Sequence, residues 1–194
     1  FEAEQALAGR LDLGAGSVAF IQCVGSRDPS LDRNFCSGVC CAYALRMARV
    51  LKTRNPQADV TVYYIDIQHF DKVQSAFRAD VERAGVKLVR GIPSSVSPSS
   101  GRLALTIDDP ATGSTTALHD TVVLSAGMQS ADGADEVAPR FGLRRNAFGF
   151  FDATAGGDAA GRVRAAGTCV EPQDLFAAMA SGRAAALDLA GGAR

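Results

Sequence analysis

Four of the five cysteines lie close together in the sequence and form the group most capable of chemistry. Twelve residues separate Cys23 from Cys36, three more separate Cys36 from Cys40, and Cys41 follows directly. Four thiolates are the usual ligands of a 4Fe-4S cluster or of a structural zinc. The spacing does not match paired CxxC zinc knuckles, and adjacent cysteines do not easily fill two corners of one zinc tetrahedron. The pattern therefore favours an iron-sulfur cluster over ordinary buried cysteines.

The composition supports a cofactor site in a reducing compartment. The chain has 194 residues, of which 47% are hydrophobic, enough to bury a core. Its net charge is −1 and its charged residues are interspersed, which indicates no nucleic-acid partner. No run of about 18 apolar residues appears, so we expect a cytoplasmic protein without direct membrane insertion. Five cysteines, an odd number, suit a metal or redox site better than a disulfide framework.

The first part of the chain alternates between strand and helix patterns. Apolar or β-branched runs predict strands, and apolar residues at helical spacing predict helices. The expected strands cover 17–22, 60–67 and 86–89, and the expected helices cover 36–53 and 70–84. This alternation is typical of a parallel, right-handed Rossmann-like unit, so the predicted fold class is α/β.

The later part has a different texture. Short strands at 103–107 and 115–118 predict a small β-meander, and the apolar run 120–127 predicts a strand. That strand ends at Gly127, where something is expected to approach the backbone closely. Residues 129–160 are weakly patterned, after which we expect a short strand at 163–167 and an Ala-rich helix from Asp174 to about residue 190.

The cysteines occupy the position of a phosphate-binding loop. In dinucleotide-binding units the turn after the first strand carries GxGxxG. Here Cys23 ends that strand, and the other three cysteines are expected at the start of the next helix, with Cys36 and Cys40 on one helical face. The helix N-terminus, together with Arg27 and Arg33, would favour thiolates.

Five segments together resemble the A subunit of heterodisulfide reductases, an iron-sulfur flavoprotein. They are FIQCVGSRD at 20–28, FCSGVCC at 35–41, YYIDI at 63–67, VLSAGM at 123–128 and AAGTC at 165–169. The resemblance spans most of the chain and extends to the flavoprotein subunit of quinone-interacting oxidoreductases. The cysteine string is specific to this group, whereas the strand motifs are shared with thioredoxin reductase-like flavoproteins.

The resemblance implies a thioredoxin reductase-like core that holds FAD and passes electrons through 4Fe-4S clusters to other subunits of a heterodisulfide reductase-like complex. It implies that Cys23, Cys36, Cys40 and Cys41 bind one cluster. It places six residues at or near the flavin: Gly127, Gly167, Thr168, Cys169, Asp174 and Leu175.

The resemblance also divides the chain into two parts. Residues 1–128 would form a nicotinamide-type Rossmann-like domain, and 129–194 the C-terminal portion of an FAD-binding domain. We therefore expect FAD only in the full-length protein and an inactive fragment in isolation. We expect the faces of 163–167 and of the last helix to be either exposed or covered by a second copy in a homodimer. No catalytic residue is assigned.

Other hypotheses remain open at this point. One is a non-enzymatic, degenerate Rossmann interaction module with a structural metal, which zinc without sulfide would support. Another is a nicotinamide-binding domain with Asp66 at the ribose position, although the glycine loop is missing. Cys169 is expected to be a small packed residue near the flavin rather than a redox thiol. His69 and His119 are expected to be surface residues without a function.

Overall fold

The structure, a computed structural model, describes residues 16–68, 72–109, 113–152 and 162–191. Two compact units share these residues. Unit 1 is made of the described residues within 16–24 and 40–126, and unit 2 is made of the described residues within 25–39 and 127–191. The segment 25–39, which contains most of the loop between Cys23 and Cys36, therefore belongs to the same unit as the residues after Ala126. The division of the chain into domains at residue 128 stays a prediction.

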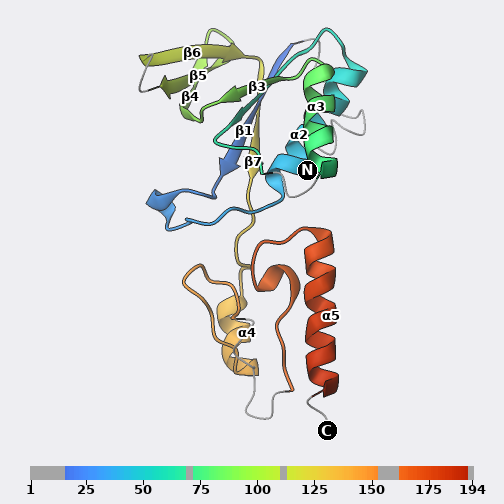
Figure 1. Cartoon of the computed structure of the whole chain (residues 1–194). Helices are drawn as coiled ribbons and strands as arrows, with labels where there is room; N and C mark the ends of the chain where they lie inside the picture. Colours follow the sequence, from blue (N-terminus) through green and yellow to red (C-terminus); the bar gives the residue numbers. More distant parts are fainter. Residues whose placement is uncertain (1–15, 69–71, 110–112, 153–161, 192–194) are drawn as a thin grey trace. The chain divides into compact units, whose positions relative to one another are not determined.

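Unit 1 is built on a parallel sheet with the strand order β3-β2-β1-β7. Two helices, α2 and α3, connect the first three strands and cover one face of the sheet (Figure 1). The elements are β1 (Ser17–Val24), α2 (Cys40–Arg54), β2 (Asp59–Tyr64), α3 (Lys72–Arg83), β3 (Lys87–Arg90) and β7 (Thr121–Ala126). This arrangement confirms the predicted Rossmann-like α/β fold.

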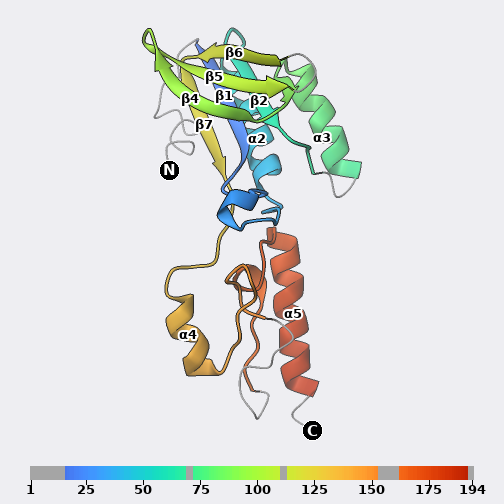
Figure 2. The same ribbon diagram turned by 90° about the vertical axis from the view of Figure 1, so that its left-hand side faces the viewer.

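A second, antiparallel sheet belongs to unit 1 and has the order β4-β5-β6. Its strands are β4 (Pro93–Ser99), β5 (Arg102–Asp109) and β6 (Gly113–His119). It lies on the side of the parallel sheet away from α2 and α3 (Figures 1 and 2). The predicted meander is confirmed, but β4 was missed because its Ser/Pro-rich sequence has low strand propensity and only pairing with β5 reveals it.

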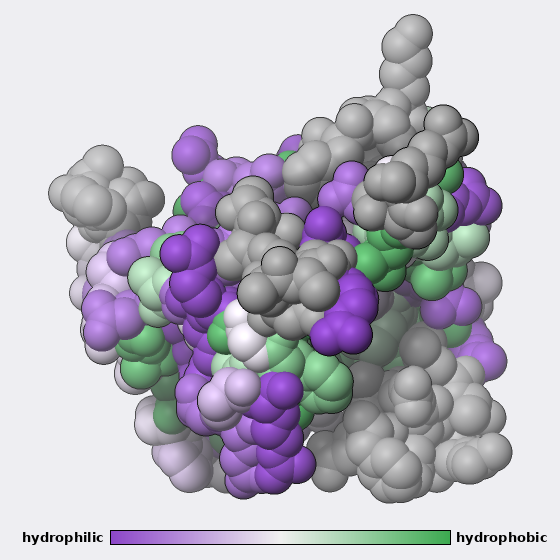
Figure 3. Space-filling model, turned by 90° about the horizontal axis from the view of Figure 1, so that it is seen from below, coloured by the Kyte–Doolittle hydropathy of each residue, from purple (hydrophilic) through white to green (hydrophobic). Residues whose placement is uncertain are grey.

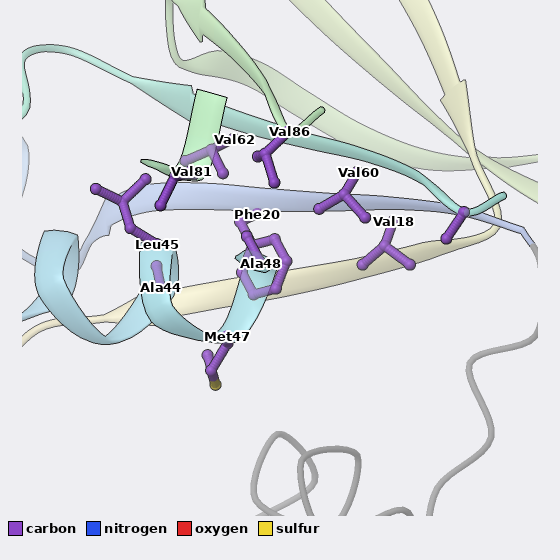
Figure 4. Packing of buried hydrophobic residues seen from close by; sticks show 11 residues of the cluster. Val18, Phe20, Ala44, Leu45, Met47, Ala48, Val60, Val62, Val81 and Val86 are labelled. Carbon is purple, nitrogen blue, oxygen red and sulfur yellow. The ribbon is translucent and has the colours of Figure 1, made fainter. Parts of the chain in front are cut away.

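The central strand β1 is buried on both faces. Val18 and Phe20 point into the core formed with α2 and α3, where Figure 4 shows Ala44 and Ala48 of α2 close to Phe20. Ala19 and Ile21 point to the other face and join a second cluster with Leu105 of β5. Burial on two faces explains why this strand is an unbroken apolar run rather than an alternating one.

Unit 2 contains the short helix α4 (Ala134–Phe141), two 3-10 turns, η1 (Pro29–Leu31) and η2 (Gly167–Cys169), and the helix α5 (Leu175–Gly191). The start of α5 agrees with the prediction, because Asp174 caps it by accepting a hydrogen bond from the Ala177 amide at 2.8 Å. The strand expected at 163–167 is wrong: the described residues 162–166 have no regular structure, since no neighbouring strand pairs with them.

Two element boundaries also differ from the prediction. The helix α2 begins at Cys40 rather than at Cys36, because Gly38 has φ of +71° and interrupts the chain before it. Cys36 and Cys40 therefore do not share a helical face. The strand β2 ends at Tyr64, three residues earlier than expected. Among the described helices, none has both the length and the apolar character needed to cross a bilayer.

His119 is buried, which corrects the expectation of a surface histidine. It is 4% exposed at the end of β6. Its Nδ1 is hydrogen-bonded to Ser17 Oγ at 2.6 Å, and its Nε2 to the Tyr63 hydroxyl at 2.9 Å. Both hydroxyls can donate or accept, so a neutral imidazole satisfies both bonds. The other histidine, His69, lies outside the described residues.

Stability of unit 1 should fall as the pH drops below about 6.5, the ordinary pKa of histidine. Burial lowers the pKa of His119; the Asp59 and Asp120 carboxylates oppose this, whereas Arg102 and Lys87 reinforce it. The unfolded chain therefore binds the proton more readily than the folded chain, so acid favours unfolding and stability is restored above that pH.

The variant His119→Gln should flatten this pH dependence and lower stability at about pH 8 by about 1–2 kcal/mol, because a buried hydrogen bond is lost. Urea unfolding followed by circular dichroism between about pH 5 and pH 8 would measure both effects. An unchanged slope in the variant would show that another group is responsible.

Candidate functional site

The carboxyl ends of β1 and β7 meet at the topological switch point of the parallel sheet. From β1 the chain passes through α2 to β2 on one side, while β7 pairs with β1 on the other. Val24 is in register with Ala126 at this end. Open α/β sheets bind their ligands outside such a point. Cys23 is the last residue but one of β1, and α2 opens with Cys40 and Cys41, so these three cysteines belong to the ligand-binding end of the sheet.

Cys23 has an unusual backbone conformation. Its φ is +61°, and the pairing of β1 with β7 shifts register between Ile21 and Val24. A non-glycine residue in the left-handed region costs about 1–3 kcal/mol, and such residues cluster at ligand sites. The irregularity also redirects the chain at the first cysteine, as β-bulges do beside functional sites.

Cys40 and Cys41 are covered by the protein. Their exposed fractions are 2% and 8%. The Cys41 thiol lies 4.0 Å from the carbonyl oxygen of Asp66 in the segment after β2. Both belong to the first turn of α2, where the positive end of the helix dipole lies.

Tyr43 fixes the first turn of α2 to the end of β7. Its hydroxyl donates a hydrogen bond to the carbonyl oxygen of Ala126 at 2.7 Å. Burial and, after it, the neighbouring Cys40 raise the pKa of Tyr43 to about 12. The phenol therefore stays protonated near neutral pH and keeps its role as donor.

Cys36 belongs to unit 2 and is exposed. The backbone N–H of Gly38 donates to its sulfur at 3.3 Å. Arg33, expected to favour thiolates, donates instead to the Gly25 carbonyl at 3.5 Å and to the Gln129 side chain at 2.7 Å. Its guanidinium thus holds the loop against the start of the C-terminal segment.

All five cysteines are described, and none forms a disulfide. The described residues contain no group of three or more cysteine, histidine or acidic side chains arranged to hold a metal ion. The donor chemistry fits an iron-sulfur cluster, since thiolates are its ligands, and the buried side chain of Gln22 has no hydrogen-bond partner among the described residues.

The close approach expected at Gly127 is made by the protein itself. A Cβ atom there would collide with the Ser37 hydroxyl and would lie 2.9 Å from the Ser26 hydroxyl. Ser37 Oγ also accepts a hydrogen bond from the Met128 amide at 2.8 Å. The loop that carries Cys36 therefore packs on Gly127. A flavin contact of Gly127 stays a prediction.

Two of the predicted flavin-side residues line a pocket of about 350 Å³ in unit 2. They are Thr168 and Cys169, and Met128 and Phe151 lie beside them. The other predicted residues are not in its lining. Gly167, with φ of +72°, donates its N–H to Ser181 Oγ at 3.0 Å, whereas Asp174 caps α5 and Leu175 is 71% exposed.

Comparison with curated proteins identifies relatives for most of the chain. The second iron-sulfur A subunit of the CoB–CoM heterodisulfide reductase of Methanopyrus kandleri is 33% identical over 183 residues, which are 87% of this chain and 27% of the relative. The A subunit of the H2:CoB-CoM heterodisulfide, ferredoxin reductase of Methanothermobacter marburgensis is 38% identical over 137 residues, 69% of this chain and 21% of the relative. The chain is a homologue of the heterodisulfide reductase A subunits.

A third relative has the same assignment. The A subunit of the ferredoxin/F420H2-dependent CoB-CoM heterodisulfide reductase of Methanosarcina acetivorans is 34% identical over 88% of this chain and 22% of the relative. The chain thus spans about a fifth to a quarter of the length of these relatives. No family model matches it. Among solved structures, a lysine monooxygenase of Nocardia farcinica aligns with a TM-score of 0.42 at 14% identity over 73% of this chain and 40% of that chain, a likeness too weak to carry an argument.

Replacing Gly127 with alanine should destabilise unit 2 by about 1–3 kcal/mol, because the added methyl group overlaps the Ser37 hydroxyl. Adding Ser37→Ala should recover part of this loss by removing that oxygen. Gly182→Ala in α5 is the matched control, since a Cβ meets nothing within 4 Å there and alanine favours a helix. Thermal unfolding measures the stability of the wild type, of Gly127→Ala with and without Ser37→Ala, and of Gly182→Ala. Equal stability of Gly127→Ala and the wild type would contradict the contact between Gly127 and Ser37.

Proposed function

We propose that this chain is the electron-transfer segment of a flavin and 4Fe-4S oxidoreductase, of the kind to which the heterodisulfide reductase A subunits belong. Cys23, Cys36, Cys40 and Cys41 are the proposed ligands of one 4Fe-4S cluster. The observation that carries the proposal is the placement of three thiols at the switch point of the sheet, where a Rossmann-like fold binds its ligand. The Methanopyrus kandleri relative, which is named as an iron-sulfur protein, supports it.

In this proposal the first turn of α2 holds two of the cluster ligands. When bound, a 4Fe-4S cluster supplies a one-electron carrier. The first turn of α2 stabilises the thiolates of Cys40 and Cys41 and keeps water from them. The bond between Tyr43 and Ala126 holds that turn against β7, so the two thiols keep a fixed position.

The proposed flavin contact lies in unit 2. Thr168 and Cys169 line a largely apolar pocket and would face FAD in the full-length protein. FAD binding and catalysis would need the rest of that protein, so we expect the 194-residue chain to purify without flavin and without activity. Its proposed partners are the other subunits of a heterodisulfide reductase-like complex, in the cytoplasm.

Anaerobic reconstitution with iron and sulfide tests the cluster. It should load about four irons and four sulfides per chain and give a broad absorption near about 400 nm, from thiolate-to-iron charge transfer. Cys40→Ala and Cys41→Ala should abolish or strongly reduce both, because each removes a ligand. Cys169→Ala is the control and should leave them unchanged, since Cys169 lines the pocket of unit 2 instead.

Two results would contradict the proposal. One is iron content that survives the changes at Cys40 and Cys41. The other is one zinc per chain without sulfide, which would instead indicate an interaction module with a structural metal.

The helix α5 exposes apolar side chains on several sides. Leu175, Phe176 and Leu187 are 71%, 80% and 73% exposed. In the view of Figure 3, hydrophobic residues reach the surface between hydrophilic ones. Exposed apolar side chains that join into one patch mark an interaction site.

We therefore expect the isolated chain to self-associate into a homodimer, which light scattering over a range of concentrations would detect. Phe176→Glu should shift it toward the monomer, whereas Arg183→Glu on the same helix should have a smaller effect. A monomer at high concentration that also fails to bind a hydrophobic dye would count against a contact role for α5.

A further inference from the structure

Gln22 is a buried amide with nothing to bond to among the described residues. Its side chain is 1% exposed, and neither Nε2 nor Oε1 has a hydrogen-bond partner in that part of the chain. Leaving a buried polar group unpaired costs about 1–3 kcal/mol. A buried polar group without a partner among the described residues calls for an explanation, and a bound cofactor, ion or water is one.

The position of Gln22 on β1 shows which way its side chain points. Side chains alternate between the two faces of a strand. Val18 and Phe20 lie in the core on the helix side, and Ala19 and Ile21 lie in the cluster on the other side. The pairing of β1 with β7 is regular up to Ile21 and shifts register between Ile21 and Val24, and in this interval Cys23 is the residue with a left-handed φ. Because the alternation is regular through Ile21, we infer that Gln22, the next residue, continues the row of Val18 and Phe20 on the helix side.

The part of α2 that covers this position is its first turn. Phe20 packs in one cluster with Ala44 and Leu45 of α2. Because α2 starts at the carboxyl end of β1 and runs back along it, the residues one turn earlier, Cys40 and Cys41, cover the next position on this row. That position is Gln22.

Other polar groups also lie at the carboxyl end of β1 and β7. Val123 of β7 is in register with Phe20 and packs on the helix-side core. Two residues later, on the same face, Ser125 is 0% exposed. The hydroxyl of Tyr43 reaches the adjacent Ala126 carbonyl. Polar groups thus lie near the first turn of α2, which contains Cys40 and Cys41, whereas the other residues of the helix-side core are apolar.

We propose that Gln22 donates its amide N–H to a sulfur of the bound cluster or of its ligands Cys40 and Cys41, and so sets the reduction potential of the centre. This inference rests on the proposed function. A thiolate or sulfide accepts hydrogen bonds but donates none, which suits the two N–H groups of the amide. Reduction adds negative charge to the sulfurs, so a donor stabilises the reduced cluster more and raises its potential.

The test compares Gln22→Met with the wild type in the reconstituted 194-residue chain. Methionine keeps the volume and removes the donor. The variant should retain its iron and sulfide, but an EPR-monitored redox titration should show a more negative midpoint potential. Thr61→Val is the control, because Thr61 is also a buried polar residue of the sheet but is paired in register with Ala19 of β1, away from the cysteine end. It should leave the potential unchanged.

A second measurement does not depend on a variant. Pulsed EPR of the reduced wild-type cluster, in protein labelled with 15N at the glutamine side-chain amide, should detect a coupled nitrogen. Its absence would overturn the inference even if Gln22→Met failed to fold.

The outcomes separate this inference from the function on which it rests. A wild-type chain that forms no cluster overturns both. A cluster whose potential is the same in Gln22→Met and the wild type overturns the role of Gln22 alone, and indicates that the amide is satisfied by a buried water.

Discussion

Burial of β1 on both faces is the constraint on which unit 1 depends. The strand pairs with β2 and β7, and its side chains fill one core against the helices and another against the antiparallel sheet. A strand in this position cannot shift by one residue without exchanging its two faces. Its register is therefore fixed, and with it the place where Cys23 leaves the sheet.

Two residues at the carboxyl end of β1 carry a free-energy cost in the folded chain. Cys23 adopts a left-handed backbone conformation, and Gln22 buries an amide that no described residue pairs. The apolar contacts of Val18 and Phe20 offset these costs in the folded chain. A bound centre with sulfur acceptors would relieve the second cost, so ligand binding and the stability of this end of the sheet are expected to be coupled.

The loop between the first two cysteines is organised by short-range contacts within unit 2. Ser37 packs on Gly127, Arg33 reaches Gln129, and Phe35 makes edge contacts with Phe148 and Phe150. Loop and C-terminal segment thus form one folded unit although about 90 residues of unit 1 separate them in the sequence. Leu175, Phe176 and Leu187 of α5, by contrast, are largely exposed.

The sequence by itself determined the α/β class, the cysteine group and the homology, because strand and helix periodicity and thiol chemistry are local properties. Only the tertiary structure decided the rest. It buried His119 between Ser17 and Tyr63, filled the space at Gly127 with Ser37, and left 162–166 without a strand partner. These outcomes depend on contacts between distant residues, which no local pattern encodes. The buried amide of Gln22 belongs with them, since its surroundings follow from the register of β1 under α2.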